Sequence, residues 1–253
     1  MKKHLSVFGF FARSSFFKVL LILLAMCAVE FTFFHFELQD ALKAYEVVGS
    51  GMPSLERMFM RAATNIYFRV ALALITVVIC LPGCEFKSKT SYTMRRLSIS
   101  ERATFFHQAA YNALVYLMLF GVQLVVVFGM SQYYLSVVPE ECISNQSMFL
   151  AFYRNDFLHS LLPLEDVGLW IRNGLLILTF ALATAEYPYR QRRHKFSTTA
   201  LALVVYTIVW FDQSIGQLGH VITTGIIALM LIGTTIYTLT RKDEEVVEDE
   251  RIS

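Results

Sequence analysis

The sequence has few of the residues that mark soluble, fibrous or disordered proteins. Only 17% of its 253 residues are charged and 56% are hydrophobic, whereas a soluble domain usually has about 25% charged residues. Its 5 prolines and 12 glycines are too few for flexible linkers or collagen-like repeats. The composition therefore excludes a disordered or fibrous protein and favours helices that lie in a membrane.

The four cysteines provide no framework for disulfide bonds. Cys27 and Cys80 lie inside apolar runs, Cys84 follows the second of these runs, and Cys142 stands alone in a polar stretch. Cys80 and Cys84 are one helical turn apart but lack a second pair of ligands. We therefore expect no metal site, no cofactor and no disulfide-stapled secreted domain.

Motifs of known catalytic chemistry are also missing. The sequence has no G-x-x-x-x-G-K-[ST] loop for nucleotide phosphates, no H-E-x-x-H metal motif and no G-x-S-x-G nucleophile motif. It has no regular series of arginines for voltage sensing. We predict no catalytic residues, no enzyme activity of the chain itself and no nucleic acid partner.

What the sequence does contain is a set of six apolar segments. A transmembrane helix needs roughly 20 mostly apolar residues. The fifth segment has only 14 residues, so a re-entrant segment is the alternative there to a full crossing. The sequence predicts an all-α fold, a polytopic membrane bundle over residues 1–240, with an acidic tail at 241–253 that we expect to be disordered. The six transmembrane helices are expected at residues 17–36, 62–81, 110–135, 167–185, 198–211 and 221–239.

Lysines and arginines are unequally distributed between the two sides of the membrane that these six crossings define. Of the 22 lysines and arginines, sixteen fall on the side of both termini, four on the other side and two inside the segments. Because cytoplasmic loops of membrane proteins carry the excess of positive charge, both termini are predicted in the cytoplasm and the chain in the plasma membrane. A cleaved signal peptide is the alternative to the first span. Its apolar core would be only about 7–15 residues, and here the apolar run continues to Phe36, so we expect an uncleaved anchor.

Two further helices are expected near the membrane surface. Apolar residues of the segment 4–17 fall partly on one helical stripe, which fits either an in-plane interfacial helix or a frayed start. Apolar residues of 147–162 recur near helical spacing. They predict one amphipathic helix that rests on the outer leaflet or caps the bundle.

Charged residues within the predicted spans need partners, because each costs at least about 2.5–3.5 kcal/mol at mid-span. Glu30 and Arg69 both lie about 9–10 Å below the predicted outer boundary, in neighbouring spans. We predict that they form an ion pair, and the alternative is a substrate or proton site. Gln123 is expected to hydrogen-bond between helices, and Asp212 and His220 to face water.

The loop between the second and third segments is the most informative one. Residues 98–101, Ser-Ile-Ser-Glu, fit the S-x-x-E capping box, so a helix that begins near Ile99 is expected to run into the third span. From Ile99 to Leu135 this helix would be about 55 Å long, so its first turns must project into the cytoplasm. The basic residues before it fit either contact with anionic lipid or a docking surface for a cytoplasmic partner.

The segment Ser91–Asn112, SYTMRRLSISERATFFHQAAYN, resembles the coupling segment in the membrane subunits of ATP-binding-cassette exporters of the type-2 permease family. The six-span layout with both termini inside is similar to that family as well. The resemblance implies a permease subunit of an ATP-driven transporter that docks on a separate ATPase and pairs with a second permease subunit. By this resemblance the ATPase contact would include Tyr92, Arg95, Arg96, Leu97, Ser98 and Glu101.

Two other classes of function stay open. A non-transporting membrane scaffold or assembly factor would have the same topology, and it differs from a permease in having no ATPase partner. A membrane enzyme with an unfamiliar site is the third class. Polar side chains that cluster around one outer cavity would favour it.

Overall fold

The computed structural model describes residues 2–49, 51–84, 101–191, 197–212 and 217–240. Over these ranges the chain is helical and contains no strand, which confirms the predicted all-α class. The helices are α1 Lys2–Val48, α2 Leu55–Arg61, α3 Thr64–Cys80, α5 Glu101–Val137, α6 Ser147–Arg154, α7 Asp156–Leu161, α8 Val167–Gln191, α9 Thr199–Trp210 and α10 Gln217–Thr240, with 3-10 turns η1 Leu81–Gly83 and η2 Glu140–Cys142.

Within the described ranges, three helices are long and apolar enough to cross a membrane, which indicates a membrane protein with several spans. They are α1 over Phe8–Val47, α5 over Ala103–Val137 and α8 over Val167–Gln191. The bent pair α2 and α3 counts as a fourth if it forms one span. Helices α9 and α10 coincide with the fifth and sixth predicted segments, but their described apolar stretches are shorter.

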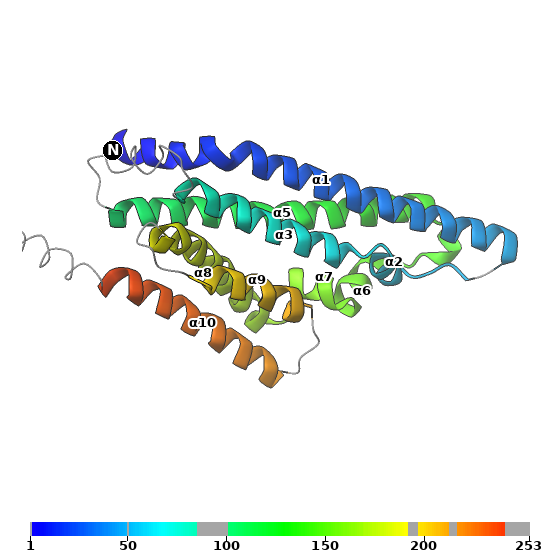
Figure 1. Cartoon of the computed structure of the whole chain (residues 1–253). Coiled ribbons are helices and arrows are strands. Elements are labelled where there is room, and N and C mark those ends of the chain that lie inside the picture. Colours follow the sequence, from blue (N-terminus) through cyan, green and yellow to red (C-terminus); the bar gives the residue numbers. More distant parts are fainter. Residues whose placement is uncertain (1, 50, 85–100, 192–196, 213–216, 241–253) are drawn as a thin grey trace, which may run out of the picture.

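The helices α1, α3, α5, α8, α9 and α10 run roughly along one direction and alternate between two ends of the bundle (Figure 1). We call the end where α1 begins the N-terminal end and the opposite one the distal end. Helix α3 ends, α5 begins, α8 ends, α9 begins and α10 ends at the N-terminal end, whereas α2, α6 and α7 lie at the distal end. Each of the six predicted segments is therefore a helix whose direction is opposite to that of the segment before it.

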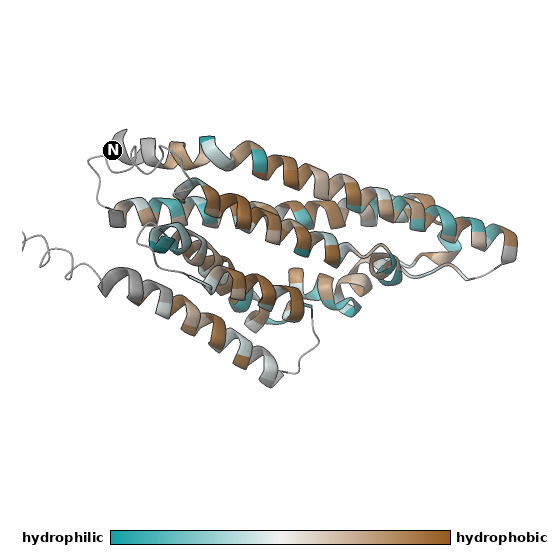
Figure 2. Cartoon of the chain, viewed as in Figure 1, coloured by the Kyte–Doolittle hydropathy of each residue, from teal (hydrophilic) through white to brown (hydrophobic). Residues whose placement is uncertain are grey.

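Helix α1 is continuous from Lys2 to Val48, so the segment 4–17 is neither a separate in-plane helix nor a frayed start. No proline interrupts its 47 residues, and at 1.5 Å per residue the helix is about 70 Å long. Figure 2 shows hydrophobic residues along the middle of α1 and hydrophilic ones toward its distal end. There Lys43 and Asp40 form an exposed ion pair at 3.7 Å. The apolar run predicted a span, but it did not reveal how far the helix continues on either side.

Helices α2 and α3 meet at a sharp corner. Their axes differ by 50°, and Ala63 between them has φ of 51°, in the left-handed region that disfavours residues with a Cβ. Helix α2 ends on two backbone hydrogen bonds, from the N–H of Ala62 to Met58 O and from the N–H of Ala63 to Met60 O. The corner lays Leu55, Met58 and Phe59 against the distal end of the core.

The single amphipathic helix predicted for residues 147–162 is instead two helices, α6 and α7. Asn155 separates them, because its side-chain Oδ1 accepts hydrogen bonds from the backbone N–H groups of Phe157 and Leu158 and so begins α7. Its Nδ2 donates to the carbonyl of Glu56 on the α2 segment at 3.3 Å. Phe152 and Leu158 are buried. The pair therefore caps the distal end of the bundle.

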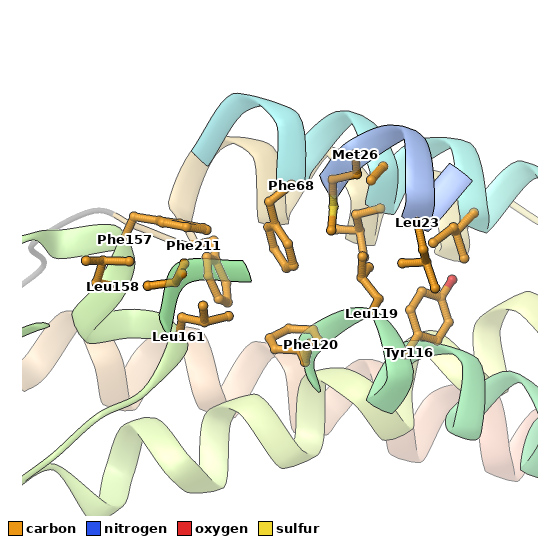
Figure 3. Close-up of a cluster of buried hydrophobic side chains, with 14 of the residues drawn as sticks. Leu23, Met26, Phe68, Tyr116, Leu119, Phe120, Phe157, Leu158, Leu161 and Phe211 are labelled. Carbon is orange, nitrogen blue, oxygen red and sulfur yellow. The ribbon is translucent and has the colours of Figure 1, made fainter. Parts of the chain in front are cut away.

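The core of the bundle is continuous from the middle of the helices to this cap (Figure 3). Leu23 and Met26 of α1 face Leu119 of α5, and toward the distal end an aromatic group takes over. Phe68 is the centre of that group, because its ring packs on three others. Their centroids lie 5.3–5.6 Å from it, and they belong to Phe120, Phe157 and Phe211.

Candidate functional site

The predicted ATPase contact lies almost wholly outside the described residues. Tyr92, Arg95, Arg96, Leu97 and Ser98 belong to the undescribed range 85–100. Glu101 is the first described residue of α5, and the predicted helix start at Ile99 lies outside the described residues. The structure therefore fixes where the contact would be attached, namely the N-terminal end of α5.

The first turns of α5 are tied to two other helices by buried polar contacts. Asn112 Nδ2 donates to Thr184 Oγ1 of α8 at 2.9 Å. On the side of α1, Ser15 Oγ donates to the Phe11 carbonyl, so Tyr111 is the donor in its 2.8 Å hydrogen bond to Ser15. Because these side chains are buried, a displacement of the start of α5 must also act on α1 and α8.

Aromatic packing reinforces both attachments. The rings of Phe105 on α5 and Tyr189 on α8 lie 6.0 Å apart, and Phe105, Ala109, Ala185 and Tyr189 form a small buried cluster of their own. On the α1 side, the rings of Phe8 and Tyr111 pack in a T-shaped arrangement with their centroids 5.6 Å apart. These contacts give α5 a fixed position at its base.

The predicted ion pair between Glu30 and Arg69 does not form. Glu30 is fully buried and accepts a hydrogen bond at 2.9 Å from Gln123 Nε2, so α1 turns this side chain toward α5 and not toward α3. In the described residues Glu30 Oε1 and Gln123 Oε1 have no hydrogen-bond partner. The expectation that Gln123 bonds between helices is confirmed.

Arg69 pairs with Asp212, so the prediction that Asp212 faces water is wrong. The two side chains are 19% and 11% exposed, and Arg69 Nη2 contacts Asp212 Oδ1 directly. Asn65, one helical turn before Arg69, donates from Nδ2 to Asp212 Oδ2 at 2.9 Å. Asp212 thus joins the segment after α9 to α3.

Phe211 explains why Asp212 reaches Arg69. It is buried within the aromatic group around Phe68, and the guanidinium of Arg172 on α8 lies 5.2 Å from its ring centroid. Phe211 therefore fixes the end of the α9 segment in the core, and the next residue faces α3. Arg172 is itself buried; it donates from Nη2 to Asn173 and has no carboxylate partner among the described residues.

A pocket opens beside the Arg69–Asp212 pair at the distal end. Its volume is about 180 Å³. The residues that line it come from α2, from the start of α3, from the α6–α7 junction and from the segment after α9; they are Phe59, Met60, Asn65, Asn155, Asp156, Phe157 and Asp212. None of these lining residues is basic.

We name these residues the distal pocket. It satisfies in part the condition set for an enzyme, since polar side chains do gather around one cavity. Asp212 is already paired with Arg69, whereas the carboxylate of Asp156 forms no ion pair within the described residues. The arrangement is suited to binding.

Within the described part of the chain, no group of three or more His, Cys, Asp or Glu residues is placed to hold a metal ion.

Comparisons with known proteins add no relative. No family model, no curated protein and no solved structure matches the chain.

Proposed function

We propose that the chain is the permease subunit of an ATP-driven exporter, with six crossings, both termini in the cytoplasm and residues 85–101 as the contact for a separate ATPase. Two such subunits, identical or different, would enclose the path. The proposal rests first on the resemblance of residues 91–112 to the coupling segment of type-2 permeases.

The arrangement of helix ends supports the proposed topology. The basic segments of the sequence are attached to the ends of α3 and α8 and to the starts of α5 and α9, all at the N-terminal end. Arg13 and Lys18 of α1 are close to that end as well. Under the positive-inside rule this end faces the cytoplasm, and the distal pocket opens on the other side.

The observation that carries the coupling role is the base of α5. This helix has 37 residues and is about 55 Å long, which exceeds a hydrocarbon core of about 30 Å, and the proposal places its first turns outside the core. Its base is joined to α1 through Tyr111 and to α8 through Asn112. A push on residues 85–101 would therefore move three long helices together.

The test is an ATPase assay on the complex purified from the native membrane through a tag on this chain. We expect an ATPase subunit in stoichiometric amount, which photolabels with azido-ATP and whose turnover falls at least about tenfold in Arg95→Glu/Arg96→Glu. The matched control is Arg57→Glu/Arg61→Glu on α2, which reverses two exposed arginines at the distal end and should keep full turnover.

Two outcomes would count against the permease. If no ATP-labelled subunit is present at stoichiometric amount, the chain is a scaffold or assembly factor. If both double variants lose turnover equally, the effect is one of general charge or folding, and residues 95 and 96 are not the contact.

A further inference from the structure

We propose that the distal pocket binds a small primary ammonium group, held by the carboxylates of Asp156 and Asp212 against the aromatic walls of Phe59 and Phe157. This inference does not depend on the transport function, because it concerns binding at the end of the bundle opposite the proposed ATPase contact.

The hydrogen bonds around the pocket leave mainly acceptors for a ligand. Asn65 donates to Asp212, and Asn155 donates to the carbonyl of Glu56 while its oxygen accepts from two backbone N–H groups. Among the side chains that line the cavity, the acceptors left without a hydrogen bond in the described residues are the carboxylate of Asp156, the remaining lone pairs of Asp212 and the side-chain oxygen of Asn65. A ligand that supplies several N–H donors matches this lining.

The charge of the pocket also favours a positively charged ligand. Two carboxylates line it, and Arg69 is the one cation joined to either of them among the described residues. Asp156 is exposed and forms no ion pair within the described ranges. One negative charge is therefore left uncompensated, and a single positive group on the ligand would balance it.

The walls and the volume limit the size of the ligand. Phe59 and Phe157 are buried and pack on other aromatic rings, so they close the inner side of the pocket as apolar walls. The volume of about 180 Å³ is below the 300–1,000 Å³ typical of pockets for drug-sized ligands. The pocket thus suits a headgroup of a few atoms, either as a free amine or as the amino end of a phospholipid.

The experiment titrates the full-length protein in detergent micelles with ethanolammonium chloride, followed by saturation-transfer NMR. Ethylene glycol serves as the neutral analogue, because it replaces the ammonium by a hydroxyl of similar size. We expect saturable binding of ethanolammonium and none of the glycol. Loss of a charge-assisted hydrogen bond in Asp156→Asn should raise Kd at least about tenfold.

Two further variants separate the site from general effects. Glu140→Gln removes one exposed acid from the same end of the molecule and should leave Kd unchanged. Met60→Trp keeps every charge but fills the cavity from its exposed side, and it should abolish binding. Melting curves by circular dichroism that match the wild type show that each variant is folded.

A second arm identifies the source of the ammonium group. In nanodiscs that contain phosphatidylethanolamine, the apparent Kd for ethanolammonium rises at least about fivefold over phosphatidylcholine nanodiscs if the lipid headgroup occupies the pocket, and it stays the same if a free amine does. The proposal is overturned if no saturable binding occurs in micelles or in phosphatidylcholine nanodiscs. It is also overturned if Asp156→Asn and Glu140→Gln bind alike, or if the glycol binds as well as the amine.

Discussion

The hydrogen bond between Gln123 and Glu30 gives the sharpest test of how α1 is held to α5. In Gln123→Leu the volume of the side chain is nearly kept, but the fully buried carboxyl of Glu30 loses its hydrogen-bond partner. An orphaned buried polar group costs about 1–3 kcal/mol, whereas a single interhelical hydrogen bond in a membrane averages only about 0.6 kcal/mol. Because Glu30 then has no other partner among the described residues, we expect a loss of about 1–2 kcal/mol.

The double variant Glu30→Leu/Gln123→Leu distinguishes the hydrogen bond from packing. Since both polar groups are then replaced by apolar ones, the double variant should be more stable than Gln123→Leu alone and within about 1 kcal/mol of the wild type. Equilibrium unfolding in mixed micelles of dodecyl maltoside and SDS, followed by circular dichroism, measures the free energies of the wild type, of both single variants and of the double variant.

Gln132→Leu is the matched control, because Gln132 lies on the same helix with its side chain exposed. Its effect should stay within about 0.5 kcal/mol. The reasoning is refuted if Gln123→Leu costs no more than this control. It is equally refuted if the losses from Glu30→Leu and Gln123→Leu simply add in the double variant.

Three other predictions follow from single contacts. Asp212→Asn removes the counter-charge of a partly buried Arg69 and should cost about 1–3 kcal/mol in the same unfolding assay, whereas a change below 0.3 kcal/mol would contradict a structural role for the pair. Ala63→Gly relieves the left-handed backbone and should be neutral or stabilise the protein by up to about 1 kcal/mol. Ala63→Val should destabilise it by at least about 1 kcal/mol. The opposite order of stabilities would contradict a left-handed conformation at Ala63. Asp166→Ala removes the acceptor of the N–H groups of Gly168 and Leu169 at the start of α8 and should lower stability by about 1 kcal/mol, while Glu165→Gln should not.

The positions of the helices could be predicted from the sequence, because apolar runs long enough for a bilayer have few alternatives to helix. Their lengths could not. The run that ends at Phe36 predicts a span, yet α1 continues to Val48 through polar residues that are good helix formers. Hydropathy marks the part of a helix that lies in lipid and carries no information about where the helix itself ends.

The partners of the charged residues could not be predicted, because they depend on how each helix is rotated about its axis. Because Glu30 and Arg69 lie at equal depth in neighbouring spans, the sequence predicted an ion pair between them. However, α1 also packs on α5, and the Glu30 side chain faces α5. A signal for the true partner of Arg69 was present. Asp212 directly follows an apolar segment at the predicted outer end, where it can reach a residue about two turns inside α3.

The break in the distal cap was also visible in the sequence. Asn155 interrupts an apolar pattern and is followed by Asp156, a pairing typical of a helix start, since asparagine is a strong N-cap and acids are favoured in the first turn. The apolar spacing over residues 147–162 does not reveal this break, because the spacing stays nearly the same on both sides of it.

The unequal lengths of the helices bear on which bilayers can host this chain. Helix α8, at 25 residues, spans about 38 Å and so leaves little to spare over a hydrocarbon thickness of about 30 Å. Helix α1 has nearly twice as many residues, but its distal part carries hydrophilic residues, so the extra length lies largely outside the lipid. Of the three described helices that are long and apolar enough to cross alone, α8 is the shortest, so a change of bilayer thickness would strain α8 before α1 or α5.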